Sequence, residues 1–367
     1  MIKLAKPHIS GKAIEKVVEV LKSGNLVQGK YVEEFENALC DYLNVKNAIV
    51  VSSGTAALHL ALLALEIKEG DEVIVPAFTF PATANVVEVV GAKPVFVDIN
   101  LSDFCIDTSK IEEAITKRTK AIMPVHEFGQ AAKMDEIVKI ANHYNLKIAE
   151  DAACALGAEF ENQKVGTFGE LGCFSFHPRK AITTGEGGVV VTSDDELAQK
   201  INVLRNHGIS YKDGKVDFIA AGLNYRMTDF QAILGICQLE DIDNIIIQRI
   251  ETANKYNNEL KKTNWIKTPH VYENRKMVYQ TYHVLLDDDK DRDKLVDYLK
   301  SKEIESNLGA QALPCLTYYK TKYKLKESDF PNAVNAYKQG LALPMGDHVT
   351  TEDITYISNT LKTMFSG

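Results

Sequence analysis

The sequence of 367 residues has no long apolar run, no dense basic block and no regular arrangement of cysteines. Its longest apolar stretch, residues 56–65, contains His59 and is too short to span a bilayer. The first 20 residues are amphipathic and do not have the continuous apolar core of a signal peptide. A net charge of −8 without a basic cluster argues against nucleic acid as the main partner. We therefore expect a protein of the reducing cytoplasm that binds neither membrane nor nucleic acid.

The six cysteines are scattered and form no CxxC pair. The sequence therefore predicts neither a zinc site nor a disulfide framework, and we expect no metal. Hydrophobic residues make up 45% of the chain and charged residues 25%, which is enough apolar material for a core without cross-links. The length suggests two domains, or one large domain with an appendage.

The sequence does contain a regular alternation of short β-rich runs with helical patterns. The strands predicted in this first part lie at residues 48–51, 72–75, 94–98, 121–125 and 147–150. Helical patterns separate them, such as AALHLALLAL after the first strand. This rhythm is typical of parallel βαβ units, and it predicts an α/β fold with a mostly parallel central sheet.

The pattern changes beyond residue 170. Residues 172–176 and 188–192 are predicted to form two strands joined by a Gly-rich connection. Residues 228–260 are predicted to form one long helical segment. The elements predicted after it are a strand at 282–286 and helices near 292–301 and 351–365. We place the domain boundary near residue 245, which gives a large domain of residues 1–245 and a smaller C-terminal α/β domain of residues 246–367.

The first local pattern with chemical meaning is Ser52-Ser53-Gly54-Thr55-Ala56, between a strand and an apolar helix. The unpaired N–H groups and the positive dipole end of a helix N-terminus bind phosphate readily. Gly54 would let the backbone approach a ligand closely, and Thr55 adds a hydroxyl donor. An ordinary serine cap on a buried helix explains the same residues without a ligand.

The second pattern is Asp151, in EDAA, directly after the strand at 147–150. Ligands of open α/β sheets lie beyond the carboxyl ends of the strands, which is where Asp151 falls. A carboxylate there can pair with a protonated ring nitrogen and keep it charged. Capping of the next helix is the simpler alternative.

The third pattern is Lys180, in FSFHPRKAITTGEGG, which follows a strand and precedes three glycines within four positions. A lysine that is partly desolvated beside a cofactor loses basicity and becomes a usable amine nucleophile. A solvent-exposed lysine next to a Gly-rich hairpin turn would explain the segment without chemistry.

Together and in this order, the motifs closely resemble those of the DegT/StrS-type sugar aminotransferases, within the fold type I pyridoxal-phosphate (PLP) enzymes. The resemblance runs from Ser23 to His348 and rests on SGTAALHLALLAL, GDEVIVPAFTFPATAN, GAKPVFVDI, EDAA, FSFHPRKAITTGEGGVVVT, LRNHG and GLNYRMTDFQA. It implies a PLP-dependent aminotransferase with L-glutamate as amino donor. The acceptor it implies is a keto-sugar on a nucleoside diphosphate, most simply a 3- or 4-keto-6-deoxy sugar, used in a ping-pong cycle.

The resemblance also implies a role for each matching residue. Lys180 would bind PLP as a Schiff base and shuttle a proton, Asp151 would pair with the pyridine nitrogen, and Phe80 would stack on the ring. The residues implied to hold the phosphate are Gly54, Thr55, Ala56 and Ser175, with Asn224 from the neighbouring subunit. The active site would then be shared, and a homodimer would be obligatory.

One position departs from the family pattern, because Cys154 stands where many members carry Gln, at or beside the contact with the PLP ring hydroxyl. A thiol is a weak donor. We therefore expect Cys154 to be a small buried residue, so that the ring hydroxyl has no protein partner here or bonds to water instead. His207, in LRNHG, matches a recurrent position near the site to which we assign no role.

Three alternatives stay open. A side branch of the family dehydrates sugars with His in place of the Schiff-base lysine, and the presence of Lys180 argues against it. Other members aminate cyclitol ketones, and the motifs do not separate these from nucleotide sugars. A non-catalytic PLP-binding regulator is the third alternative, although it would have no need to retain Lys180 and Asp151. Residues 306–316 occupy the stretch that often shapes the substrate pocket, without identifying the sugar.

Overall fold

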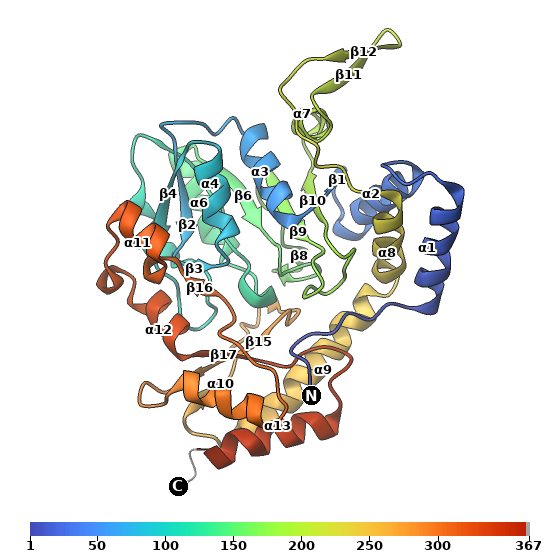
Figure 1. The fold of residues 1–367 in the computed structure, drawn as a ribbon. Helices are drawn as coiled ribbons and strands as arrows, with labels where there is room; N and C mark the ends of the chain where they lie inside the picture. Colours follow the sequence, from blue (N-terminus) through green and yellow to red (C-terminus); the bar gives the residue numbers. More distant parts are fainter. Residues whose placement is uncertain (365–367) are drawn as a thin grey trace.

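Seven strands form one sheet in this computed structural model, which describes residues 1–364 (Figure 1). In spatial order they are β1 (Asn47–Val51), β10 (Gly188–Thr192), β9 (Leu171–Ser175), β6 (Lys147–Asp151), β5 (Thr119–Ile122), β2 (Glu72–Pro76) and β4 (Lys93–Val97). Only β10 pairs antiparallel with its neighbours, β1 and β9, and the other pairs are parallel. The predicted α/β fold with a mostly parallel sheet is confirmed, and each predicted strand lies within three residues of its observed bounds.

The β-branched residues of the strands are buried on both faces of this sheet, because helices cover both faces. One face packs on α3 (Gly54–Ala64), α4 (Ala82–Val89) and α7 (Asp195–Arg205). The other packs on α2 (Lys30–Leu43), α6 (Met134–Tyr144) and α8 (Asp229–Leu239). The short α5 (Ile111–Ala114) and the N-terminal α1 (Gly11–Ser23) complete this part of the chain, and α1 contacts α8.

A smaller antiparallel sheet lies in the C-terminal part, in the order β13 (Ile266–Lys267), β15 (Tyr282–Leu286) and β17 (Gly340–Leu343). Its helices are α9 (Ile242–Leu260), α10 (Arg292–Ser301), α11 (Thr317–Tyr323), α12 (Pro331–Gln339) and α13 (Thr351–Met364). The predicted boundary at residue 245 falls inside α9, and the domain division stays a prediction. The N-terminus joins the C-terminal part, because Ile2 bridges Ile304.

The single helical segment predicted at residues 228–260 is wrong, since α8 ends at Leu239 and α9 starts at Ile242. Asp241 between them has φ −114° and ψ 10°, outside the helical region. Asp is unfavourable in a helix interior, which is consistent with a break at this point, although Asp241 does not cap the α9 backbone and its Oδ1 accepts from Asn244 Nδ2 instead. The start of α8 is fixed by a capping box between Thr228 and Gln231.

Short strands outside the two sheets link distant parts of the chain. β3 (Phe78–Thr79) pairs antiparallel with β16 (Gln311–Ala312), which joins the two halves of the sequence. β14 (Arg275–Lys276) pairs with β7 (Glu159–Phe160), which pairs with β8 (Gln163–Lys164). The hairpin of β11 (Ile209–Lys212) and β12 (Lys215–Phe218) projects from the body of the molecule (Figure 1).

Among residues 1–364, no helix has both the length and the apolar character needed to cross a membrane.

Candidate active site

Asp151 ends strand β6 at the carboxyl edge of the large sheet, as predicted from the sequence. Its side chain is buried and accepts hydrogen bonds from Thr83 Oγ1 at 2.8 Å and from the Ala153 N–H at 3.2 Å. Burial raises the pKa of the Asp151 carboxyl, while Thr83, Ala153 and the charge of Lys180 oppose that rise. A buried carboxylate held by two donors is suited to face a cationic ring nitrogen.

The N-terminus of α3 lies at the end of β1 and is capped by Ser53, whose Oγ accepts from the Ala56 N–H at 3.1 Å. The ordinary serine cap considered for this segment is therefore present. Gly54 and Thr55 carry the remaining N–H groups of the first turn. A Cβ on Gly54 would lie 2.7 Å from the Ser175 Cβ, so no other residue fits without displacing it. The structure thus brings Gly54 and Ser175 together, with Thr55 exposed beside them.

Lys180 lies in the connection between β9 and β10, and its Nζ is 2.9 Å from the Cys154 Sγ. The connection is closed by hydrogen bonds from Phe176 N–H to Gly187 O and from Lys180 N–H to His177 O. Gly187 has no room for a side chain, since a Cβ would lie 2.2 Å from Thr184 Oγ1. Burial raises the pKa of the Cys154 thiol, which keeps the thiol protonated beside the lysine. Lys180 is half-buried rather than fully exposed.

Phe80 follows β3, and its side chain is 70% exposed. The same Thr83 that donates to Asp151 also contacts the Phe80 carbonyl, with Oγ1 to O at 3.2 Å. Thr83 therefore fixes the segment of Phe80 relative to the Asp151 carboxylate. The exposed ring is free to cover a flat ligand at this edge.

Asn224 lies on the segment before α8, where it forms an isolated bridge with Asn206, and its side chain is exposed. His207 adopts a left-handed backbone conformation with φ 55°, and its N–H donates to Leu223 O. The two residues belong to the base of the projecting hairpin. Their roles at the site stay predictions.

Three buried polar residues at this edge, His126, Glu127 and Glu150, were not assigned a role from the sequence. Glu150 accepts from His126 Nε2 at 2.9 Å and from the N–H groups of Gly166, Phe168 and Gly169 at 2.7, 2.6 and 2.8 Å. His126 Nδ1 accepts from a backbone N–H, so the proton of its neutral ring lies on Nε2. Because Glu150 precedes Asp151, this network fixes the strand end that carries the site. The next residue after His126, Glu127, is also buried.

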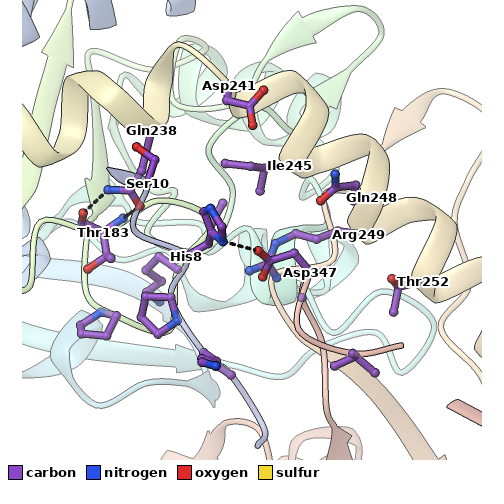
Figure 2. A pocket seen from close by; sticks show the side chains of 18 of the residues that line it. His8, Ser10, Thr183, Gln238, Asp241, Ile245, Gln248, Arg249, Thr252 and Asp347 are labelled. Atoms are coloured by element: carbon purple, nitrogen blue, oxygen red, sulfur yellow. Dashed lines mark hydrogen bonds and ion pairs between the residues drawn. The ribbon is translucent and has the colours of Figure 1, made fainter. Parts of the chain in front are cut away.

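A cavity of about 460 Å³ adjoins Lys180 and extends between the N-terminal segment and the start of α9 (Figure 2). His8 and Asp347 face one another across it, with Nδ1 to Oδ2 at 3.2 Å. Arg249 lies beside Asp347, and its Nη1 donates to Tyr279 O at 3.1 Å. Burial lowers the pKa of Arg249 to about 10. Of the residues predicted to bind the cofactor, Lys180 alone lines this cavity.

These residues fit PLP. Three features lie at one edge of the sheet. They are the buried carboxylate of Asp151 for the ring nitrogen, the amine of Lys180 beside Cys154, and the N-terminus of α3, where Gly54 has no room for a side chain. An exposed aromatic ring at Phe80 lies on the segment tied to the carboxylate. Lys180, Asp151 and the N-terminus of α3 would thus supply the amine, the carboxylate and the anion-binding N–H groups that a phosphorylated, cationic aromatic ring requires.

Comparison with known proteins gives consistent results. Residues 7–362 match the DegT/DnrJ/EryC1/StrS aminotransferase family. The chain is 39% identical to a GDP-perosamine synthase of Caulobacter vibrioides, covering 96% of this chain and 95% of that protein. It is 38% identical to a UDP-4-amino-4,6-dideoxy-N-acetyl-beta-L-altrosamine transaminase of Campylobacter jejuni, covering 98% and 96%. Among solved structures, the PLP form of Spr1654 from Streptococcus pneumoniae superposes with a TM-score of 0.93 at 29% identity, covering 99% and 98%.

Proposed function

We propose that this chain, which belongs to the DegT/DnrJ/EryC1/StrS aminotransferase family, transfers an amino group from L-glutamate to a keto-sugar linked to a nucleoside diphosphate. The chain is a PLP-dependent aminotransferase, and its relatives are nucleotide-sugar aminotransferases. The names of these relatives contain a GDP-linked and a UDP-linked amino sugar, which supports a nucleotide sugar as the acceptor. The simplest such acceptor is a 3- or 4-keto-6-deoxy sugar. The observation that carries the proposal is the convergence of Lys180 with Cys154 and Asp151 at the sheet edge.

PLP, when bound, withdraws electrons from the carbon that loses its proton. We assign Lys180 Nζ to carry the cofactor and then to take and return that proton. Asp151, held by Thr83, keeps the proton on the ring nitrogen. Gly54 and Thr55 offer N–H groups to the phosphate at the positive end of α3, with Ala56 and Ser175 beside them.

Orientation and shape come from the surrounding side chains. We assign Phe80 to cover one face of a bound ring and Cys154 to lie beside the ring hydroxyl, to which its thiol would be a weak partner. The cavity beside Lys180 gives room for part of a substrate. Because one site serves donor and acceptor in turn, we expect ping-pong kinetics.

We also propose a homodimer in which Asn224 completes the site of the partner. The projecting hairpin supports it, because Tyr211 is 73% exposed and Phe218 65% exposed on an element that has no cover in the monomer (Figure 1). Exposed apolar side chains gathered on one element mark an interaction surface. Burial of the hairpin against a second copy would bring the neighbouring Asn224 across the interface.

The test is a two-stage assay of the purified protein with PLP. L-Glutamate alone should convert the cofactor to its amine form, with loss of the visible band and release of 2-oxoglutarate. A panel of GDP-, UDP- and dTDP-linked keto-sugars, with scyllo-inosose as the cyclitol comparison, should then restore the band. Restoration by the cyclitol alone would replace the nucleotide-sugar proposal. No conversion by any amino donor would indicate a regulator.

A further inference from the structure

Arg249 is a buried arginine of helix α9, and only 8% of its surface is exposed. Its Nη1 donates to the carbonyl oxygens of Tyr279 and Gln280, at 3.1 and 3.4 Å. Its Nε is buried and has no hydrogen-bond partner among residues 1–364. Within the same part of the chain, Nη2 makes no hydrogen bond and no carboxylate lies within ion-pair distance of the guanidinium. A buried cation with unpaired N–H groups is costly, so a partner from outside the chain has to be considered.

The contacts of Nη1 account for only one end of the guanidinium. Tyr279 has φ 47°, a conformation that is uncommon for a residue other than glycine, and Arg249 holds its carbonyl group. A purely structural arginine would act in this way, as a clamp on the backbone of residues 279–280. This role leaves out Nε and Nη2, which together form one edge of the planar group. That edge offers two N–H groups side by side, the geometry that binds both oxygens of a carboxylate.

Arg249 lines the cavity of about 460 Å³ beside Lys180, together with Gly346 and Asp347 (Figure 2). A Cβ on Gly346 would lie 3.9 Å from Nη2, so this nitrogen lies close to the wall that Gly346 forms. The Asp347 carboxylate lies beside Arg249, but its Oδ2 faces His8 Nδ1 at 3.2 Å. Burial lowers the pKa of Arg249 to about 10 and the charge of Asp347 opposes this, so the guanidinium is charged at neutral pH. The cavity therefore holds a fixed positive charge that a ligand can pair.

Hydrogen bonds tie Arg249 to the loop that carries Lys180. Gln280, whose carbonyl accepts from Arg249, donates from its Nε2 to Arg179 O at 2.8 Å. Arg179 directly precedes Lys180, and Lys180 itself lines the cavity. A group bound at Arg249 is therefore held in a set position relative to the loop of the lysine that we assign to the cofactor.

The charge and the size of the cavity favour a small carboxylate as the ligand. Three acidic residues line it, Asp241, Glu251 and Asp347, and they disfavour a multiply charged diphosphate. One unpaired guanidinium matches a single carboxylate. A volume of about 460 Å³ lies toward the low end of the range for small-molecule sites, which gives room for an amino acid rather than for a whole nucleotide sugar.

We propose that the Nε–Nη2 edge of Arg249 binds the distal carboxylate of an acidic amino donor, the carboxylate farther from the amino group. This inference rests on the proposed transfer from L-glutamate, and it adds the residue that distinguishes glutamate from its neutral amide, glutamine. The amide has one acceptor oxygen and no charge, so it leaves part of the buried edge unpaired. Glutamate is therefore preferred, by the charge and by the second hydrogen bond.

Glutarate, a dicarboxylate without an amino group, tests the site without turnover. It should bind the PLP-loaded protein in a calorimetric titration, and Arg249→Gln should weaken its binding at least about thirtyfold, because a buried charge pair loses one partner. Arg249→Lys keeps the charge without the fork and should weaken binding about tenfold while retaining the fold by circular dichroism, so the test does not depend on the folding of Arg249→Gln.

Two further variants give the controls. Lys255→Gln removes a lysine of the same cavity that donates to Thr351 Oγ1, and its affinity should stay within about twofold of wild type. Asp347→Asn removes the carboxylate beside Arg249 and should tighten glutarate binding about threefold or more. Equal affinities in wild type and Arg249→Lys, an equal loss in Lys255→Gln, weaker binding by Asp347→Asn, or no binding by wild type would overturn the proposal.

The second test compares L-glutamate with L-glutamine in the first half-reaction, followed by loss of the visible band. Wild type should prefer glutamate at least about tenfold, and Arg249→Lys should remove most of that preference. A preference that survives in the variant would refute the inference while leaving the proposed function intact. A wild type that does not react with L-glutamate, yet loses glutarate affinity in Arg249→Lys, would refute the proposed donor and leave the carboxylate site. Weaker binding of GDP and UDP by Arg249→Lys, with glutarate unchanged, would assign the arginine to the diphosphate of the acceptor instead.

Discussion

Replacing Glu127 by Gln should stabilise the cofactor-free protein against unfolding, and the gain should grow with pH. The folded-state pKa of Glu127 is about 8, whereas the ordinary value is 4.5. Between these two values the unfolded chain has already lost the proton that the folded chain retains. The stability that this group contributes is therefore fully present below pH 4.5 and is lost as the pH rises through about 8.

The magnitude follows from the same two values. Each pH unit of difference corresponds to about 1.4 kcal/mol, so wild type should lose about 5 kcal/mol from this one group across the window. The glutamine side chain of the variant does not titrate, and the other carboxyl groups with a raised pKa, Glu36, Asp103 and Asp151, are present in both proteins. The stability difference between Glu127→Gln and wild type should therefore be small near pH 5 and should approach about 5 kcal/mol near pH 9.

Urea unfolding of the two cofactor-free proteins across this pH range gives the difference directly. Glu113→Gln is a matched control, because Glu113 lies exposed on α5 and loses the same charge. Its stability should stay within about 0.5 kcal/mol of wild type. Parallel pH dependence for Glu127→Gln and wild type would refute the reasoning, since it would mean that Glu127 ionises normally in the folded protein.

Other predictions concern the proposed site. Lys180→Ala should abolish transamination in the glutamate assay while retaining the fold by circular dichroism; substantial steady-state turnover would remove Lys180 from its assigned role. Asp151→Asn should lower kcat at least about a hundredfold with little change in stability, because the ring nitrogen loses its charged partner. Near-normal rates would mean that another group protonates the ring. Gly54→Ala should weaken PLP binding about tenfold or more in a fluorescence titration, because the added methyl group meets Ser175 Cβ at 2.7 Å, and unchanged affinity would place the phosphate elsewhere. Inactive Lys180→Ala chains should also be mixed with Asn224→Ala chains. If Asn224 acts across the dimer, each mixed dimer has one intact site, and because half of the dimers are mixed, about a quarter of wild-type activity should return. If Asn224 acts within its own chain, no activity should return.

The central sheet was accessible from sequence because each of its strands is short, apolar and followed by a helical pattern. Residues 282–286 and 292–301 match β15 and α10 without error, since both are bounded by charged or polar residues. The break at Asp241 was missed because apolar residues continue on both sides of it, and only the low preference of Asp for a helix interior signals the break.

The candidate site was predicted in part, because the carboxyl ends of parallel strands place Asp151 and the end of β9 at one edge. The contact between Lys180 and Cys154 depends on how the Gly-rich connection folds back, which spacing alone does not specify. Glu127 was missed because a glutamate in a loop is usually solvated. One signal could have found it, since HEFG follows the strand run AIMPV at the same sheet edge as Asp151.

The pairing of β3 with β16 limits how the specificity of this protein can be re-engineered. Residues 306–316, where a substrate pocket is often shaped, contain β16, and β16 is hydrogen-bonded to the strand immediately before Phe80. The Leu313 N–H also donates to Ala77 O. A loop transplanted from a relative with another substrate would therefore shift the Phe80 ring unless residues 77–83 were exchanged with it. The two segments form one interchangeable module, and their sequences should be varied together in any library built to change the substrate.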